Sequence, residues 1–154
     1  ILHMDNYYKD LSHIVEEDRL LSTNFDVPDA FDMDLFIDHI ICLKNGNSIM
    51  TPKYDYYTAS RIGHLLLESK KIVIVEGILL LQDRYIRDLL DYSVFLDVPD
   101  FIRFSRRRNR DITTRGYTSQ EVSIMYENVR NMYGLWIEPY DIFADIQIKE
   151  NRVI

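Results

Sequence analysis

The chain is poor in features that mark several classes of protein. Cys42 is its one cysteine, so a disulfide within the chain is excluded and nothing indicates secretion. The longest apolar runs, residues 72–75 and 78–81, are separated by Glu76 and Gly77, and each is too short to span a bilayer. No signal peptide is visible. We therefore expect no membrane segment, and a cytoplasmic protein is the default interpretation.

Positive charge is also scarce. Lysine and arginine number 18 against 25 aspartates and glutamates, which gives a formal net charge of −7. A general nucleic-acid binder needs clustered cations to meet the phosphate backbone, so we expect no nucleic-acid partner. A small charged nucleotide needs only a local cluster of arginines, and one is present between Arg103 and Arg115.

The chain does contain short apolar runs that alternate with amphipathic stretches. Of its 154 residues 47% are hydrophobic, which suffices for one domain with a buried core. Apolar runs predict strands at 1–4, 71–75, 92–97 and, more weakly, 145–148. Helical spacing predicts helices at 32–44, at 100–112 after Pro99, and at 119–137, with Ser119 as a cap and Val122 at its N3 position. The alternation predicts an α/β fold with a parallel sheet and helices on both faces. A β-hairpin is predicted from 49–57 and 62–67.

Polar residues that follow the predicted strands are candidates for chemistry, because open parallel sheets bind ligands at the carboxyl ends of their strands. They are Asp5, Glu76 and Asp97. Asp5 has the right group to orient an alcohol and accept its proton during phosphoryl transfer, although a turn residue is the plainer interpretation. Glu76 has the right group to hold a Mg²⁺-bound water, and an acid at the end of a buried strand needs some partner.

Acidic residues are also concentrated in residues 24–32, which lead into the first predicted helix. A short aspartate near a helix start can accept hydrogen bonds from vicinal ribose hydroxyls, or it can cap the free N–H groups of the helix. We favour a division of roles, with Asp26 binding a ligand and Asp32 capping the helix.

Three motifs, taken in order, resemble the uridine/cytidine kinase family. They are residues 4–10 (Met-Asp-Asn-Tyr-Tyr-Lys-Asp), residues 24–32 (Asn-Phe-Asp-Val-Pro-Asp-Ala-Phe-Asp) and residues 76–79 (Glu-Gly-Ile-Leu). The resemblance implies a P-loop kinase sandwich of the nucleoside monophosphate kinase type. It implies transfer of a phosphoryl group from ATP, with Mg²⁺, to the 5′-hydroxyl of a nucleoside, best guessed as uridine or cytidine in pyrimidine salvage. A homotetramer is implied as well.

The resemblance also assigns roles on the nucleoside side of the site. Asp5 becomes the catalytic base and, with Glu76, part of the metal site. Tyr8 matches the aromatic that closes on the nucleoside, and Phe25 packs beside Asp26, which holds the ribose. Tyr54 and Tyr56, in a flap at about 46–68, match aromatics that line the base pocket, although a cross-strand aromatic pair would also explain them.

On the phosphate side, the resemblance makes residues 103–118 a lid. Arg110 and Arg115 would face the ATP phosphates, with Arg110 also counted as catalytic, and Arg107 would face the nucleoside. A charge run is otherwise most simply a solvated helix face, here one that Arg103, Arg107 and Arg110 share.

The sequence departs from the family pattern in two ways. Ala59, Tyr117 and Met125 stand where the family has a base-reading histidine, an arginine and a glutamine. A different ribonucleoside, or a non-catalytic ligand-binding relative, is therefore an alternative function. The phosphate loop G-x-x-x-x-G-K-[ST] is also absent, and we expect a segment of roughly 30 residues with the first strand and this loop to precede Ile1.

Overall fold

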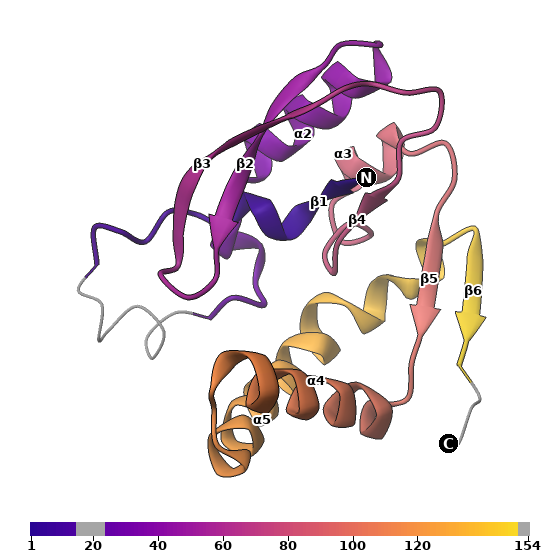
Figure 1. Cartoon of the computed structure of the whole chain (residues 1–154). Helices are drawn as coiled ribbons and strands as arrows, with labels where there is room; N and C mark the ends of the chain where they lie inside the picture. Colours follow the sequence, from indigo (N-terminus) through magenta and orange to yellow (C-terminus); the bar gives the residue numbers. More distant parts are fainter. Residues whose placement is uncertain (15–23, 151–154) are drawn as a thin grey trace. The chain divides into compact units, whose positions relative to one another are not determined.

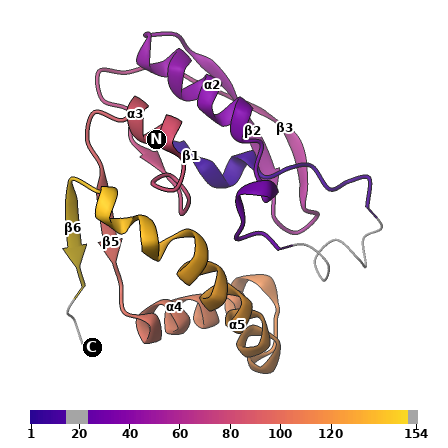
Figure 2. The same cartoon turned by 180° about the vertical axis from the view of Figure 1, so that it is seen from behind.

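The structure is a computed structural model that describes residues 1–14 and 24–150. They form two compact units, Ile1–Leu89 and Leu90–Ile154. Figures 1 and 2 show the elements of both units from opposite sides. Within the described ranges, none of the helices combines the length and the apolar character needed to cross a membrane.

The first unit contains a short parallel strand pair, a hairpin and two α-helices. Its elements are β1 (Leu2–His3), the 3₁₀ helices η1 (Met4–Tyr7) and η2 (Pro28–Ala30), α2 (Met33–Lys44), β2 (Ile49–Asp55), β3 (Ser60–Leu67), β4 (Val75–Glu76) and α3 (Arg84–Leu89). The second unit contains β5 (Val94–Asp97), α4 (Asp100–Arg115), α5 (Ser119–Trp136), the 3₁₀ helix η3 (Glu138–Phe143) and β6 (Ile146–Lys149).

Two parallel strand pairs are present, and the first one is short. Strand β1 pairs with β4 through Leu2–Val75 and His3–Glu76, and β5 pairs with β6 over four residues. Of the predicted strand 71–75 only Val75 lies in β4, residues 71 and 72 form a bend, and Glu76 lies in the strand rather than after it. The pair ends after His3 and Glu76, because the chain leaves the extended conformation at Met4 to enter η1.

The predicted hairpin is confirmed. Strands β2 and β3 are antiparallel, and their register shifts at a bulge between Lys53 and Tyr54. Helix α2 lies beside β2 (Figure 1). The predicted cap is confirmed too, because the Asp32 side chain accepts a hydrogen bond from the backbone N–H of Leu35 at 3.3 Å.

The start of α5 differs by one residue from the prediction. Thr118, not Ser119, is the N-cap, and its hydroxyl accepts the N–H of Glu121 at 3.2 Å. The Glu121 carboxylate in turn accepts the backbone N–H of Thr118 at 2.7 Å. This shift places Glu121 rather than Val122 at N3 and completes a reciprocal capping box, which satisfies two N–H groups at once.

The core of the first unit forms around the segment that follows β1. Met4 and Tyr7 are fully buried on η1, and the Tyr7 ring meets Phe36 of α2 edge-on with centroids 4.8 Å apart. A Cβ added to Gly77 would lie 2.7 Å from the Met4 sulfur. Gly77 therefore makes room for the Met4 side chain. Core packing thus fixes the residues on both sides of Asp5.

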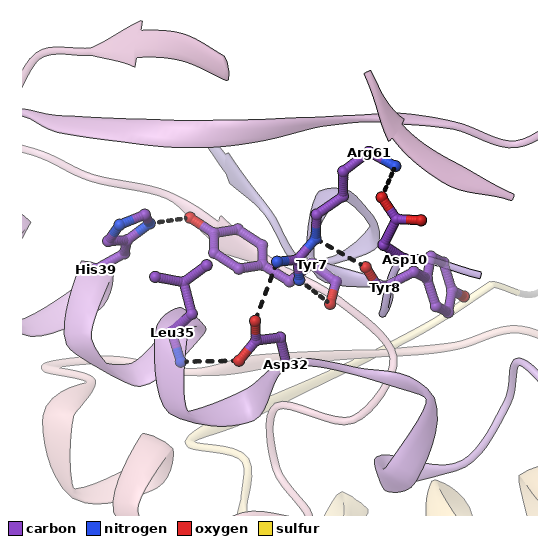
Figure 3. Close-up of polar contacts among 7 residues, drawn as sticks. All are labelled: Tyr7, Tyr8, Asp10, Asp32, Leu35, His39 and Arg61. Atoms are coloured by element: carbon purple, nitrogen blue, oxygen red, sulfur yellow. Dashed lines mark hydrogen bonds and ion pairs between the residues drawn. The ribbon is translucent and has the colours of Figure 1, made fainter. Parts of the chain in front are cut away.

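Tyr7 also makes a polar contact that predicts a dependence of stability on pH. Its hydroxyl lies 2.6 Å from Nδ1 of His39 (Figure 3). Burial raises the pKa of Tyr7 to about 12, so the phenol keeps its proton at neutral pH, and the tautomer of His39 decides which group donates the hydrogen bond. Burial lowers the pKa of His39 below its ordinary 6.5, while Asp38 and Asp32 act in the opposite direction and His64 adds to the lowering.

Because the folded pKa of His39 is lowered, the unfolded chain binds the proton more readily. Below about pH 6.5 the unfolded state therefore gains stability relative to the folded one, by at most about 1.4 kcal/mol per pH unit for one proton. We expect the free energy of unfolding, measured by urea titration, to decrease as the pH is lowered from 7.5 to 5. His39→Asn keeps an acceptor near Tyr7 without titrating, and it should show a shallower fall. An identical slope in both proteins would contradict the prediction.

Candidate active site

Tyr8 is the centre of a group of aromatic side chains in the first unit. It is 8% exposed and stacks on Phe31 with ring centroids 4.2 Å apart. Phe25 meets its ring edge-on at 5.5 Å, and Tyr54 of β2 lies at 5.4 Å. Tyr56 contacts Tyr54 at 5.5 Å. The four aromatics proposed from sequence therefore come together from three separate segments, and Phe31 joins them without having been predicted.

Two of the predicted carboxylates lie near the same phenol. Burial raises the pKa of Tyr8 far above its usual range, and the charges of Asp5 and Asp26 raise it further, as do Tyr56 and Tyr54. The acid that follows β1 and the acid of the 24–32 segment therefore both act electrostatically on the same buried phenol.

Local turn geometry places Asp26. The backbone N–H of Asp26 donates to the side-chain oxygen of Asn24 at 3.1 Å, which is the pattern of an Asx turn. Beyond it, Pro28 starts η2, and Asp32 begins α2. Asp26 and Asp32 are therefore held in different local structures, and the ligand-binding role of Asp26 stays a prediction.

Tyr54 carries a polar atom that its surroundings leave unsatisfied. The side chain is 6% exposed, and among residues 1–14 and 24–150 its buried hydroxyl finds no hydrogen-bond partner. Burial raises its pKa to about 12, so the hydroxyl is protonated and can donate as well as accept. Buried polar groups are usually hydrogen-bonded, and an exception inside an aromatic cluster indicates a position that a ligand atom can satisfy.

Glu76 has the partner that its position required, and the partner is His3. Their Oε1 and Nδ1 atoms are 2.6 Å apart across the β1–β4 pair, and both side chains are 52% exposed. The strand was expected to be buried, whereas Val75 is partly exposed and Glu76 exposed. Asp5 follows His3 by two residues, so both carboxylates belong to the carboxyl end of the same strand pair.

The fit of this strand end to Mg²⁺ can be judged from its donors. In nucleotide enzymes Mg²⁺ is commonly held by one or two carboxylates, with waters and phosphate oxygens completing the octahedron. Asp5 and Glu76 supply such a pair. The described part of the chain contains no group of three or more His, Cys, Asp or Glu residues placed to hold a metal without these other ligands.

In the second unit, three arginines of the predicted lid converge on one buried carboxylate. Asp111 of α4 is fully buried. Its Oδ1 lies 2.9 Å from Nε of Arg110 and 3.5 Å from Nη1 of Arg115. Its Oδ2 lies 3.3 Å from Nε of Arg107, an ion pair without the angles of a hydrogen bond. Arg103 instead stacks on Tyr133, with its guanidinium carbon 3.5 Å from the ring centroid.

Sequence reasoning missed two charged residues that the structure makes prominent. Neither Asp111 nor Arg61 was singled out from the sequence. For Asp111 a sequence signal exists, since arginines stand four positions before it and four positions after it. Residues at this spacing meet on one helix face. Arg61 had no such local signal, since its partners lie 29 to 54 positions away.

The three residues that depart from the family pattern lie in different surroundings. Ala59 is 1% exposed, has a φ of 49°, and accepts the N–H of Leu11 at 3.0 Å through its carbonyl. It thus places a buried methyl group in the turn between β2 and β3. Tyr117 and Met125 belong to the second unit, where both are partly exposed.

Comparison with known proteins places this arrangement in a class. The model of the phosphoribulokinase/uridine kinase family matches residues 1–153. A uridine kinase from Clostridium perfringens is 45% identical over 152 residues, which cover 97% of this chain and 73% of that protein. A uridine kinase from Halalkalibacterium halodurans is 44% identical over 158 residues, covering 99% of this chain and 74% of that protein.

A solved structure agrees in fold. The crystal structure from Silicibacter sp. TM1040 that carries the name of a fructose transport system kinase aligns with a TM-score of 0.72 at 22% identity. The alignment covers 96% of this chain and 73% of that one. Together with the family match it confirms the predicted α/β fold class of the P-loop kinases.

The chain is therefore that of a phosphotransferase of the kinase class. It belongs to the phosphoribulokinase/uridine kinase family. The resemblance inferred from residues 4–10, 24–32 and 76–79 is confirmed.

Proposed function

We propose that this chain provides the acceptor site of a kinase that transfers the γ-phosphoryl group of ATP to the 5′-hydroxyl of a ribonucleoside. The observation that carries the proposal is the gathering of Asp5, Asp26 and the aromatic residues around Tyr8. Carboxylates that can hold hydroxyl groups lie there beside flat rings that can hold a base. The names of the relatives make uridine the first substrate to test, and the resemblance to the uridine/cytidine kinases adds cytidine.

The roles of the residues follow from their chemistry. Asp5 orients the 5′-hydroxyl, and as the oxygen attacks phosphorus its proton passes to the carboxylate. Asp26 accepts hydrogen bonds from the ribose hydroxyls. Tyr8 and Tyr54 enclose the base, with the Tyr54 hydroxyl available to one of its polar atoms. Positioning of this kind supplies much of the rate enhancement in phosphoryl transfer.

Mg²⁺ would supply neutralisation of phosphate charge, and Glu76 with Asp5 would hold it through water or directly. Arg110 and Arg115 would bind the ATP phosphates once they exchange the Asp111 carboxylate for phosphate oxygens, and Arg107 would act on the nucleoside side. A cytoplasmic location and a homotetramer stay predictions.

A ribonucleoside other than uridine or cytidine is the second candidate. The observation that favours it is the buried methyl group of Ala59, which can make no hydrogen bond to a base. Sites that lack a hydrogen-bonding partner discriminate less strongly among bases. A non-catalytic ligand-binding relative is a further alternative, and the presence of Asp5 and Glu76 speaks against it, because binding alone does not require them.

A panel of nucleosides tests the proposal. The natural protein is incubated with ATP and Mg²⁺ and with uridine, cytidine, adenosine, guanosine or 2′-deoxyuridine, and nucleoside monophosphate is measured by chromatography. We expect uridine or cytidine to be converted fastest and 2′-deoxyuridine more slowly, because Asp26 loses one of its hydroxyl partners. Conversion of a purine nucleoside alone would favour the second candidate. Nucleoside binding without any product would favour the non-catalytic alternative.

A further inference from the structure

Arg61 joins the three segments that make up the candidate nucleoside site. It lies near the start of β3, and its side chain is 21% exposed. Nε donates to the carbonyl of Tyr8 at 3.1 Å, and Nη2 donates to the carbonyl of Tyr7 at 3.2 Å. Nη1 donates to the Asp32 carboxylate at 3.0 Å. Figure 3 shows the guanidinium between these three acceptors.

The shape of the guanidinium matters for this arrangement. Its planar fork directs several N–H groups at fixed angles, whereas the single ammonium of a lysine is a point donor. The acceptors here are two successive backbone carbonyls and a carboxylate, each reached by a different nitrogen of Arg61. Only an arginine can satisfy all three from one position.

The contacted segments are those that carry the candidate site residues. The carbonyls belong to Tyr7 and Tyr8, two and three residues after Asp5. The segment 24–32, which carries Phe25 and Asp26, is attached at the same place. The N–H of Asp32 donates to the Tyr7 carbonyl at 2.8 Å, and Lys9 donates to the carbonyl of Ala30 at 2.8 Å.

The backbone of Arg61 adds a second attachment. Its N–H donates to the Asp10 carboxylate at 3.2 Å (Figure 3). Hydrogen bonds from Ser12 are the largest cause that lowers the pKa of Asp10, and Arg61 adds to the effect, so Asp10 is charged at neutral pH. The hairpin that bears Tyr54 and Tyr56 is thus bound to residues 7–10 at both the main chain and the side chain of one residue.

We infer that Arg61 is a positioning residue of the nucleoside site. It sets the distance between two groups of residues: Asp5 and Tyr8, which follow β1, and the tyrosines of the hairpin. It acts through these groups without touching the substrate. The inference rests on the proposed function, because it concerns the geometry of that same site.

Replacement of Arg61 by methionine tests the inference. Methionine keeps an apolar stem and removes every donor. We expect kcat/KM for the nucleoside to fall by about 10- to 100-fold, since small misplacements of reacting groups are costly, while KM for ATP stays within about twofold. Arg61→Lys should recover little of this loss, because one ammonium cannot serve three acceptors. Added guanidinium at millimolar concentration should partly restore Arg61→Ala.

Asp32→Asn offers a milder variant that keeps the fold. Asparagine caps helices as well as aspartate does, so α2 retains its N-cap while the ion pair with Arg61 is lost. We expect a smaller fall of kcat/KM in the same direction, and the double variant with Arg61→Met should lose less than the sum of the two. If Arg61→Met does not fold, Asp32→Asn and Arg61→Lys decide the question.

Arg84→Met is the matched control, since the Arg84 side chain is 84% exposed and pairs only loosely, at 3.7 Å, with Asp88. Its kcat and KM should stay within about twofold of the unmutated protein. Two results would overturn the positioning role and leave the proposed function standing. One is an Arg61→Met protein whose nucleoside KM and kcat per active molecule are unchanged, and the other is full recovery of activity in Arg61→Lys. An unmutated protein that neither binds nor phosphorylates any nucleoside would overturn the proposed function and the inference together.

Discussion

Replacing Asp5 by asparagine is expected to lower turnover by roughly 10²- to 10⁴-fold, the range that a positioned general base contributes. Asparagine has nearly the same shape and can still orient a hydroxyl, but it cannot take up its proton. Asp5 is half-buried on η1 between Met4 and Tyr7, which are fully buried. Its backbone is therefore held independently of its side chain. Initial rates of monophosphate formation at saturating ATP measure the effect.

The nucleoside KM of Asp5→Asn should change by no more than about threefold, because the aromatic residues and Asp26 remain. Asp34→Asn is a suitable control, since Asp34 is an exposed residue in the first turn of α2. It should retain full turnover. Turnover of Asp5→Asn equal to that of the control, with both proteins folded by circular dichroism, would remove Asp5 from the proposed mechanism.

The second large effect is expected on stability, from Asp111→Asn. The carboxylate is fully buried and attracts Arg107, Arg110 and Arg115. Without its charge, the three guanidinium groups repel one another at the end of α4, and hydrogen bonds to a charged acceptor are lost. The arginines are partly exposed and regain some hydration, so we expect a loss of about 2–3 kcal/mol in the free energy of unfolding.

Asp97→Asn is the control for this measurement. Asp97 lies 3.8 Å from Lys149 in a largely exposed pair, and its loss should cost about 0.5 kcal/mol or less. Urea denaturation of both variants and of the unmutated protein gives the comparison. A loss from Asp111→Asn that is no larger than that of the control would mean that Asp111 does not organise the arginines.

Features that depend on neighbouring residues were predictable from sequence. The hairpin was predicted at 49–57 and 62–67, and the cap by Asp32 followed from an acid placed before a helical stripe. The start of α5 was misplaced by one residue, because Thr118 and Ser119 are both good caps. Only the reciprocal bond with Glu121 selects the first of them.

Features that depend on distant residues were less accessible. The family resemblance brought Asp5, Tyr8 and Tyr54 together, whereas spacing alone gave a turn, a core tyrosine and a cross-strand pair as plainer interpretations. Arg61 escaped notice because its role depends on backbone carbonyls of another segment, and carbonyls carry no sequence signal. The exposure of Glu76 depends on what lies across the strand end, which local sequence does not encode.

The central claim is that the site around Asp5 and Tyr8 presents the 5′-hydroxyl of a nucleoside to ATP. The most direct test follows labelled γ-phosphate from ATP to uridine and, in parallel, to 5′-deoxyuridine, which keeps the base and ribose but lacks the acceptor. The account predicts labelled uridine 5′-monophosphate from the first and no labelled nucleoside from the second, with 5′-deoxyuridine acting as a competitive inhibitor. Label on 5′-deoxyuridine, or no transfer to uridine or to any other ribonucleoside, would contradict it.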